Sequence, residues 1–255
     1  MIRRADGDGW LLLTQPDHAA LSGMFAERWG SPGGDFALGD PQEPVLLAAR
    51  EHDIGWKEWE VAPTVDPATG RPRHFLEMPV PEILPIWSRG PRLAAELDPY
   101  AGILVSLHAT RIFRPRYIGG RDPAEDRAEL RRFLEEQEAL RSTLRPRVNV
   151  ADAVVTAHSA LVGVWDRLSL LLCCGPIPAA VLEGVPARGG TLDVRILPQG
   201  ERAAALDPYP FRGGPVVAAV AARRLPARPF PSTEAFRAAR RAAPTEHLEF
   251  TLRPA

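Results

Sequence analysis

Residues 48–60 read AAREHDIGWKEWE and place His52 beside Asp53 within an apolar, helix-like run. Val45, Ala49 and His52 fall on one stripe of a 3.6-residue period, which predicts that the imidazole faces the core. An imidazole or carboxylate that is buried without a partner costs roughly 1–3 kcal/mol, and more when it is charged. The doublet therefore predicts a partner for both side chains inside the fold.

Two other predicted helices also carry an inward-facing polar residue. On a helix spanning about residues 15–29, His18, Leu21 and Phe25 recur at i, i+3 and i+7, so they share one face. A long apolar helix in the second half of the chain carries Asp166. We therefore expect polar side chains from three core helices to converge.

One divalent metal ion would satisfy all of these groups together. Two neutral imidazoles and two carboxylates form a mixed N/O ligand set that suits zinc, manganese, iron or, with weaker preference, magnesium. Such a set leaves coordination positions open for water and substrate, and a metal lowers the pKa of a bound water. The predicted ligands are His18, His52, Asp53 and Asp166.

The remaining chain predicts a mainly α protein, a helical bundle with a small C-terminal antiparallel β element. Further helices are expected near 82–97, from Asp98 through His108, and near 123–144. A short strand-like piece spans Trp10 to Leu13, and after Pro176 the runs TLDVRIL, PVVAAVAARRL and EHLEFTL are typical of strands. We assign residues 1–186 to a helical domain and 187–255 to a β-rich extension packed on it.

Residues 61–81 contain too much proline for regular structure, and a loop of this length is usually functional or mobile. We interpret this segment as a candidate lid.

Composition narrows the function classes. The formal charge is −1 and no basic excess is present, so a nucleic-acid backbone is not an expected partner and a small molecule is. The amino-terminal apolar run is far too short for a signal peptide, and no segment has membrane-spanning length. Only two cysteines occur, without metal-site or disulfide spacing, which predicts a reducing, cytoplasmic setting. The oligomeric state is left open.

The motif HDIGW, preceded by LLAARE, resembles the His-Asp motif of the HD-domain metal-dependent phosphohydrolase superfamily. The pattern of that superfamily is a first histidine on an early helix, the doublet on the next and a distant aspartate on a later helix. His18, the doublet, and Asp166 within VWDRLSLLL match it in order, so the resemblance implies an HD-like bundle and the same four metal ligands. With its QPDHAALSG opening and terminal sheet, the chain is also similar to a bacterial family known only as a domain of unknown function.

The resemblance implies a hydrolase of phosphate esters, nucleotides among them, that uses metal-activated water. Asp53 would also orient or deprotonate that water, and His108 would protonate the leaving oxygen. Cations near the doublet or on the candidate lid would bind the phosphate. These are Lys57, Arg71, Arg73 and His74.

Two alternative hypotheses are left open at this stage. If His108 and His158 complete a second metal site, the chain would be an HD-type di-iron oxygenase. If the polar cluster is internally hydrogen-bonded, the chain would be a non-catalytic binding or structural protein. The metal content of the purified protein separates the three interpretations.

Overall fold

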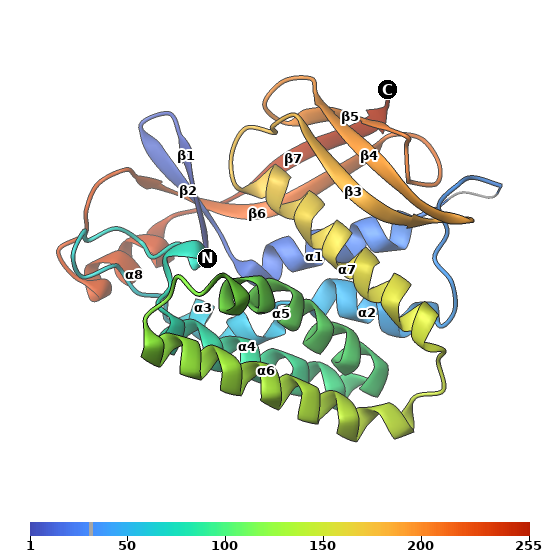
Figure 1. The fold of residues 1–255 in the computed structure, drawn as a ribbon. Coiled ribbons are helices and arrows are strands. Elements are labelled where there is room, and N and C mark those ends of the chain that lie inside the picture. Colours follow the sequence, from blue (N-terminus) through green and yellow to red (C-terminus); the bar gives the residue numbers. More distant parts are fainter. Residues whose placement is uncertain (31–32) are drawn as a thin grey trace.

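The computed structural model describes residues 1–30 and 33–255, and most of its helices gather on one side of a curled sheet (Figure 1). The α-helices are α1 (Gln15–Arg28), α2 (Gln42–Glu51), α3 (Lys57–Val61), α4 (Val80–Leu97), α5 (Pro99–Gly119), α6 (Ala124–Leu144), α7 (Asp152–Cys173) and α8 (Thr233–Ala242). Three short 3₁₀ segments are η1 (Ile54–Trp56), η2 (Phe75–Glu77) and η3 (Arg145–Arg147).

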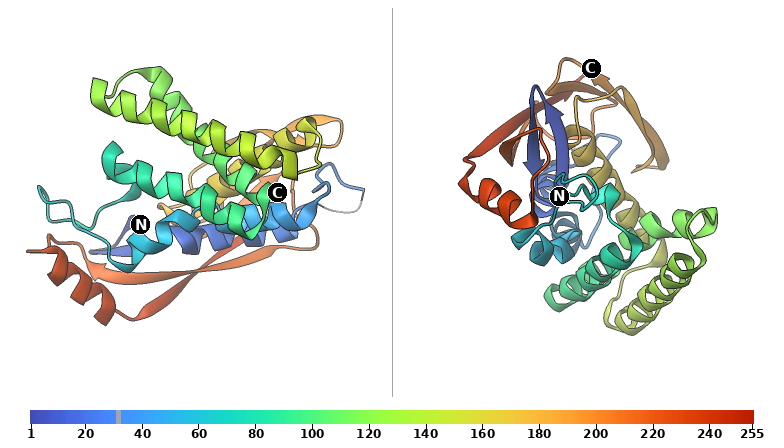
Figure 2. Two further views of the ribbon diagram at one scale, coloured as in Figure 1. Left: turned by 90° about the horizontal axis from the view of Figure 1, so that it is seen from below. Right: turned by 90° about the vertical axis from the view of Figure 1, so that its left-hand side faces the viewer.

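The strands form one seven-stranded mixed sheet. They are β1 (Ile2–Asp6), β2 (Gly9–Leu13), β3 (Ala180–Ala187), β4 (Gly190–Pro198), β5 (Ala203–Asp207), β6 (Val216–Pro226) and β7 (Thr245–Pro254). Their order is β1-β2-β6-β7-β5-β4-β3, with β5 and β7 parallel and all other neighbours antiparallel. The sheet curls into a half-barrel over α1 and α7 (Figure 2).

The predicted fold class, a mainly α HD-like bundle with a small C-terminal antiparallel β element, is therefore wrong. The predicted strand runs correspond to β2, β4, β6 and β7, but three more strands join them in a mixed sheet. β5 has the sequence AAALD, which has little strand propensity, and β3 contains Gly184, Pro186 and a register shift. β2 is buried along its whole length and shows no alternation. These strands depend on distant partners that local patterns do not encode.

The sheet also connects the two ends of the chain. Trp10 of β2 lies opposite Leu225 of β6, so strands from both sides of residue 186 pair directly. The largest hydrophobic core likewise combines Phe25 of α1 and Leu104 of α5 with Phe250 of β7. The division into domains 1–186 and 187–255 stays a prediction.

The candidate lid, residues 61–81, contains η2 and is tied to other parts of the fold. Phe75 N donates to Met1 O, Phe230 N donates to Gly70 O, and Arg237 of α8 donates to Pro63 O. That this segment opens and closes as a lid stays a prediction. Within the described parts of the chain, no helix is both long and apolar enough to cross a bilayer.

Helix α5 is capped by Asp98 at its N-terminus, and this cap gives a first testable expectation. Asp98 Oδ1 accepts hydrogen bonds from Tyr100 N at 2.7 Å and Ala101 N at 2.9 Å. Asp98→Ala leaves both donors without their acceptor, so we expect a loss of about 1 kcal/mol in the free energy of unfolding. Asp98→Asn should keep most of this stability, since asparagine caps equally well. Urea denaturation measures both, and equal losses in the two variants would contradict the cap.

Candidate functional site

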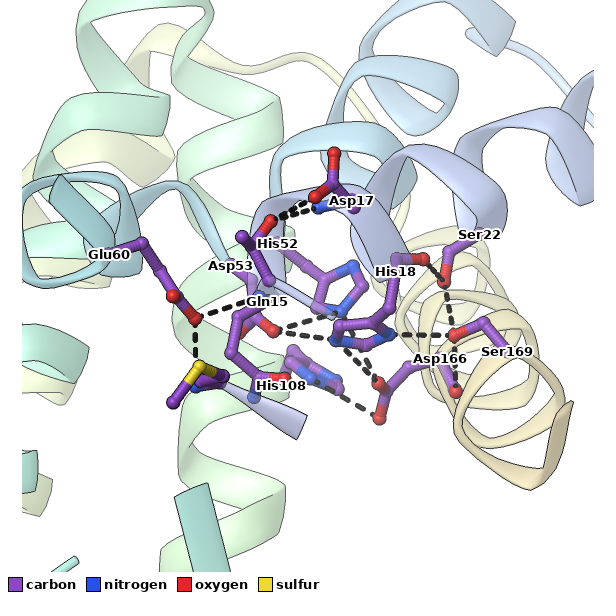
Figure 3. Close-up of polar contacts among 12 residues, drawn as sticks. Gln15, Asp17, His18, Ser22, His52, Asp53, Glu60, His108, Asp166 and Ser169 are labelled. Atoms are coloured by element: carbon purple, nitrogen blue, oxygen red, sulfur yellow. Dashed lines mark hydrogen bonds and ion pairs between the residues drawn. The ribbon is translucent and has the colours of Figure 1, made fainter. Parts of the chain in front are cut away.

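Five polar side chains, three from α1, α5 and α7 and two from the junction between α2 and η1, meet in the interior of the fold (Figure 3). Four of them are at most 2% exposed, and Asp166 keeps 14% of its side chain exposed. His18 comes from α1, His52 ends α2, Asp53 precedes η1, His108 comes from α5 and Asp166 from α7. All four predicted metal ligands and the predicted proton donor are therefore brought together.

The ligand atoms of the four predicted ligands have the spacing of a small coordination sphere. His18 Nε2 lies 2.7 Å from Asp53 Oδ2, and His52 Nε2 lies 3.3 Å from Asp166 Oδ1. The two crossed distances, His18 to Asp166 and His52 to Asp53, are 3.9 and 3.8 Å. Four ligands at ~2.1 Å from a tetrahedral metal are about 3.4 Å apart. The donor set therefore fits one cation.

Both imidazoles of this set are oriented by a hydrogen bond from the opposite ring nitrogen. His52 Nδ1 donates to Ala49 O at 2.8 Å. His18 Nδ1 donates to Ser169 Oγ at 2.8 Å, because the Ser169 hydroxyl itself donates to Asp166 O. In its neutral form, each ring then presents an Nε2 lone pair to the carboxylates, which is the arrangement of metal-binding histidines.

Several buried atoms of the cluster are left without partners among the described residues. These are His52 Nε2, Asp53 Oδ1 and both ring nitrogens of His108. The short contact from His18 Nε2 to Asp53 Oδ2 joins a lone pair to a carboxylate oxygen, so it requires a proton or a metal ion between them. Unsatisfied buried groups at this density are rare in folded proteins unless a ligand completes them.

The electrostatics of the cluster are strongly coupled. Burial favours the neutral ring of His52, but the Asp53 charge and the contact with Asp166 outweigh burial and raise its pKa to about 9. For His108 burial dominates and lowers the pKa to about 4. Burial also opposes ionisation of Asp166, yet its contact with His52 Nε2 and the neighbouring His108 and His18 rings hold its pKa well below the usual range. Positive charge is therefore favoured beside these carboxylates.

His52 and Asp53 connect α2 to η1. Gly55 determines how closely this junction approaches α4. A Cβ added at Gly55 would lie 2.2 Å from Ile86 O and 2.9 Å from Gly90 N. Only glycine allows these two backbones to approach so closely. The glycine of the HDIGW motif thus lets η1, which follows Asp53 directly, lie close to α4.

The predicted phosphate-binding residues do not join the cluster. Lys57 pairs with Glu51 at 2.7 Å, and Arg73 pairs with Glu82 at 3.1 Å. The His74 ring accepts a hydrogen bond from Leu76 N and caps η2. Arg71 lies exposed on the 61–81 loop.

His158, which the oxygenase hypothesis places at a second metal site, also lies apart from the cluster. His158 Nδ1 bonds to the Tyr100 hydroxyl at 2.8 Å and does not contact the other histidines. Asp17, the residue before His18, accepts a hydrogen bond from Thr14 at the start of α1. His158 therefore does not complete the second metal site that the oxygenase hypothesis requires.

Sequence reasoning missed the hydroxyl pair that supports His18. Ser22 donates within a network that includes Ser169 Oγ at 2.9 Å, and both serines are buried. Ser22 lies one turn after His18 on α1, and Ser169 lies one turn after Asp166 on α7. Helical spacing from the predicted ligands was the signal that would have found them.

Comparison with known proteins gives one family. A family model described as "Protein of unknown function (DUF3891)" matches residues 1–227. No curated protein and no solved structure matches the chain.

Proposed function

The chain belongs to this family of proteins of unknown function, and we propose that it is a metal-dependent hydrolase of phosphate esters, with nucleotides among the substrates to test. The observation that carries the proposal is the convergence of His18, His52, Asp53 and Asp166 with their ligand atoms 2.7–3.9 Å apart. These four residues would hold one divalent cation. The likeness to the HD-domain superfamily is part of this proposal and rests on the same four residues.

When bound, such a cation lowers the pKa of a water molecule and neutralises negative charge on a phosphoryl oxygen. Asp53 offers its second oxygen, the buried and unpartnered Oδ1, to orient the attacking water and accept its proton. His108 lies beside Asp166, with Nε2 3.7 Å from Oδ2. Since its pKa is about 4, its ring is neutral near pH 7 and would donate a hydrogen bond to the leaving oxygen.

The other two hypotheses have less support. A di-iron oxygenase would need two further histidines beside the cluster, and His158 is bonded to Tyr100 instead. A non-catalytic protein with a hydrogen-bonded polar core would be expected to satisfy its buried groups internally, whereas His52, Asp53 and His108 each keep an unpartnered atom in the described fold.

Elemental analysis of the untagged protein beside Asp53→Ala tests the metal, with Asp152→Asn as the control. Asp152 lies on α7 and is 91% exposed, so its loss should leave the cluster unchanged. We expect about one metal ion per chain in the wild type and the control, and almost none in Asp53→Ala. Two ions per chain would mean that the His52–His108–Asp166 group is also filled and would contradict a single-metal site.

A panel of phosphomonoesters, phosphodiesters and nucleotides then tests the reaction. We expect hydrolysis that a chelator abolishes and that the added metal restores, with Asp53→Ala inactive. A metal-loaded wild type that cleaves nothing in the panel, or activity that survives in Asp53→Ala, would contradict the proposal.

Ser169 provides a prediction that is independent of activity. Ser169→Ala removes the oxygen that accepts the His18 Nδ1 proton, so the ring loses its orienting bond. Loss of such a partner typically costs 10–100-fold in metal affinity, and we expect a decrease of about that size. Competition with a chromophoric chelator measures it. Thr156→Ala removes an exposed hydroxyl from the same helix and should leave the affinity unchanged.

We also propose a cytoplasmic location and a small phosphorylated molecule as the partner. Cys173 is buried, Cys174 is exposed and both are free thiols, which suits a reducing compartment. Cell fractionation tests the location, and recovery of the protein from an oxidising compartment would contradict it.

A further inference from the structure

Arg111 lies on α5 one turn after His108, a rise of about 4.5 Å along the helix axis. The side chain is exposed as a whole, but its guanidinium turns onto α7 and is partly covered there. Nη2 donates to Ser159 Oγ at a long 3.3 Å. Arg111 therefore brings a positive charge from the surface to the helix that carries Asp166.

The charge of Arg111 has no counterion among residues 1–30 and 33–255. Two other arginines near the same helix layer are paired, Arg116 with Asp122 and Arg141 with Glu138. Burial lowers the pKa of Arg111, and no neighbouring carboxylate counters that effect. The group still stays charged at any physiological pH, so most of its donors are free for an anionic ligand.

The guanidinium of Arg111 packs against α7 at Gly163, which lies one turn before Asp166. A Cβ built on Gly163 would lie 2.8 Å from Arg111 Nη1, so the absence of a side chain lets the guanidinium lie against the helix. Glycine inside a helix costs about 1 kcal/mol relative to alanine. The close contact with Arg111 therefore explains why this helix has a glycine at position 163.

Arg111 lies next to the cluster along both α5 and α7. His108 Nε2 lies 3.7 Å from Asp166 Oδ2, and Arg111 and Gly163 are each one turn from one of these two residues. Asp166 is the least buried member of the cluster, with 14% of its side chain exposed, and Gly163, which contacts Arg111, lies one turn before it on α7.

We propose that Arg111, seated on Gly163, binds the non-bridging oxygens of the substrate phosphate and holds it beside the His–Asp cluster. A guanidinium presents a planar fork of donors that matches two phosphate oxygens at once. This inference rests on the proposed function. It assigns phosphate binding to a residue far in sequence from the doublet, in place of Lys57, Arg71, Arg73 and His74.

Calorimetric titration with inorganic phosphate tests the inference on metal-loaded protein from which excess metal has been removed. We expect Arg111→Gln to weaken phosphate binding at least tenfold with unchanged metal content, and Arg111→Lys to weaken it less. Gly163→Ala should give an intermediate loss, because the new methyl group displaces the guanidinium. Arg114→Gln is the matched control, since Arg114 is an exposed arginine one turn further along α5.

Steady-state hydrolysis of p-nitrophenyl phosphate gives the second readout, with KM raised at least tenfold in Arg111→Gln. Phosphate binding that is unchanged in Arg111→Gln, equally weakened in Arg114→Gln, or absent from the wild type would overturn the inference. Failure of the proposed function is distinguishable, because it would show as phosphate binding that depends on Arg111 without hydrolysis of any ester.

Discussion

Loading the chain with a divalent cation is expected to raise the midpoint of thermal unfolding by roughly 8–16 °C. A ligand that binds only the folded state at about 1,000 times its Kd adds about 4 kcal/mol of stability. Each kcal/mol shifts the midpoint by about 2–4 °C in a protein of around this size. The physical source is the cluster itself, where a cation would satisfy the unpartnered His52 Nε2 and the facing carboxylates of Asp53 and Asp166.

Differential scanning fluorimetry with zinc, manganese, iron(II) and magnesium measures this shift and ranks the metals. His52→Ala should abolish the metal-dependent shift of the unfolding midpoint, whereas Asp152→Asn should keep this shift. A wild-type midpoint that does not respond to any of the four metals would contradict the metal site. An equal shift in His52→Ala would mean that the metal binds elsewhere.

The His–Asp cluster, which is the proposed metal site, could be predicted from sequence because a helix encodes its own buried face. His18 shares a stripe with Leu21 and Phe25, and all three are buried on α1. The doublet also follows the apolar stripe of α2, and Asp166 lies on the long apolar α7. Periodicity thus identified which polar residues face inward, although their convergence is a property of the tertiary fold.

The sheet and the cations around the site could not be predicted in this way. β1 pairs with β2, and β2 pairs in turn with β6, which lies more than two hundred residues later in the sequence. No local pattern encodes that pairing. The cations chosen for phosphate binding were those near the doublet in sequence, but Lys57 and Arg73 have carboxylate partners of their own. Arg111 becomes a candidate only once α5 and α7 are seen to cross.

Gly55→Ala is expected to destabilise the protein by roughly 1–3 kcal/mol and to weaken metal binding at the same time. The added methyl group would lie 2.2 Å from Ile86 O, a backbone atom that cannot rotate away as a side chain can. Overpacking of this kind is relieved by backbone shifts, which cost about that much. Asp53 lies two residues before Gly55, so any shift of η1 away from α4 also moves a proposed metal ligand.

Gly90→Ala is the matched control, because Gly90 lies on the other side of the same contact. Its substitution is expected to change the free energy of unfolding in the opposite direction. A Cβ on Gly90 would meet Gly55 N at 3.5 Å, an ordinary van der Waals distance. Alanine in the interior of α4 should then stabilise the helix by roughly 0.5–1 kcal/mol. Urea denaturation and chelator competition on both variants measure the two effects. If Gly55→Ala kept wild-type stability and metal affinity, the junction would not depend on the close approach of η1 to α4, and the glycine of the HDIGW motif would need another explanation.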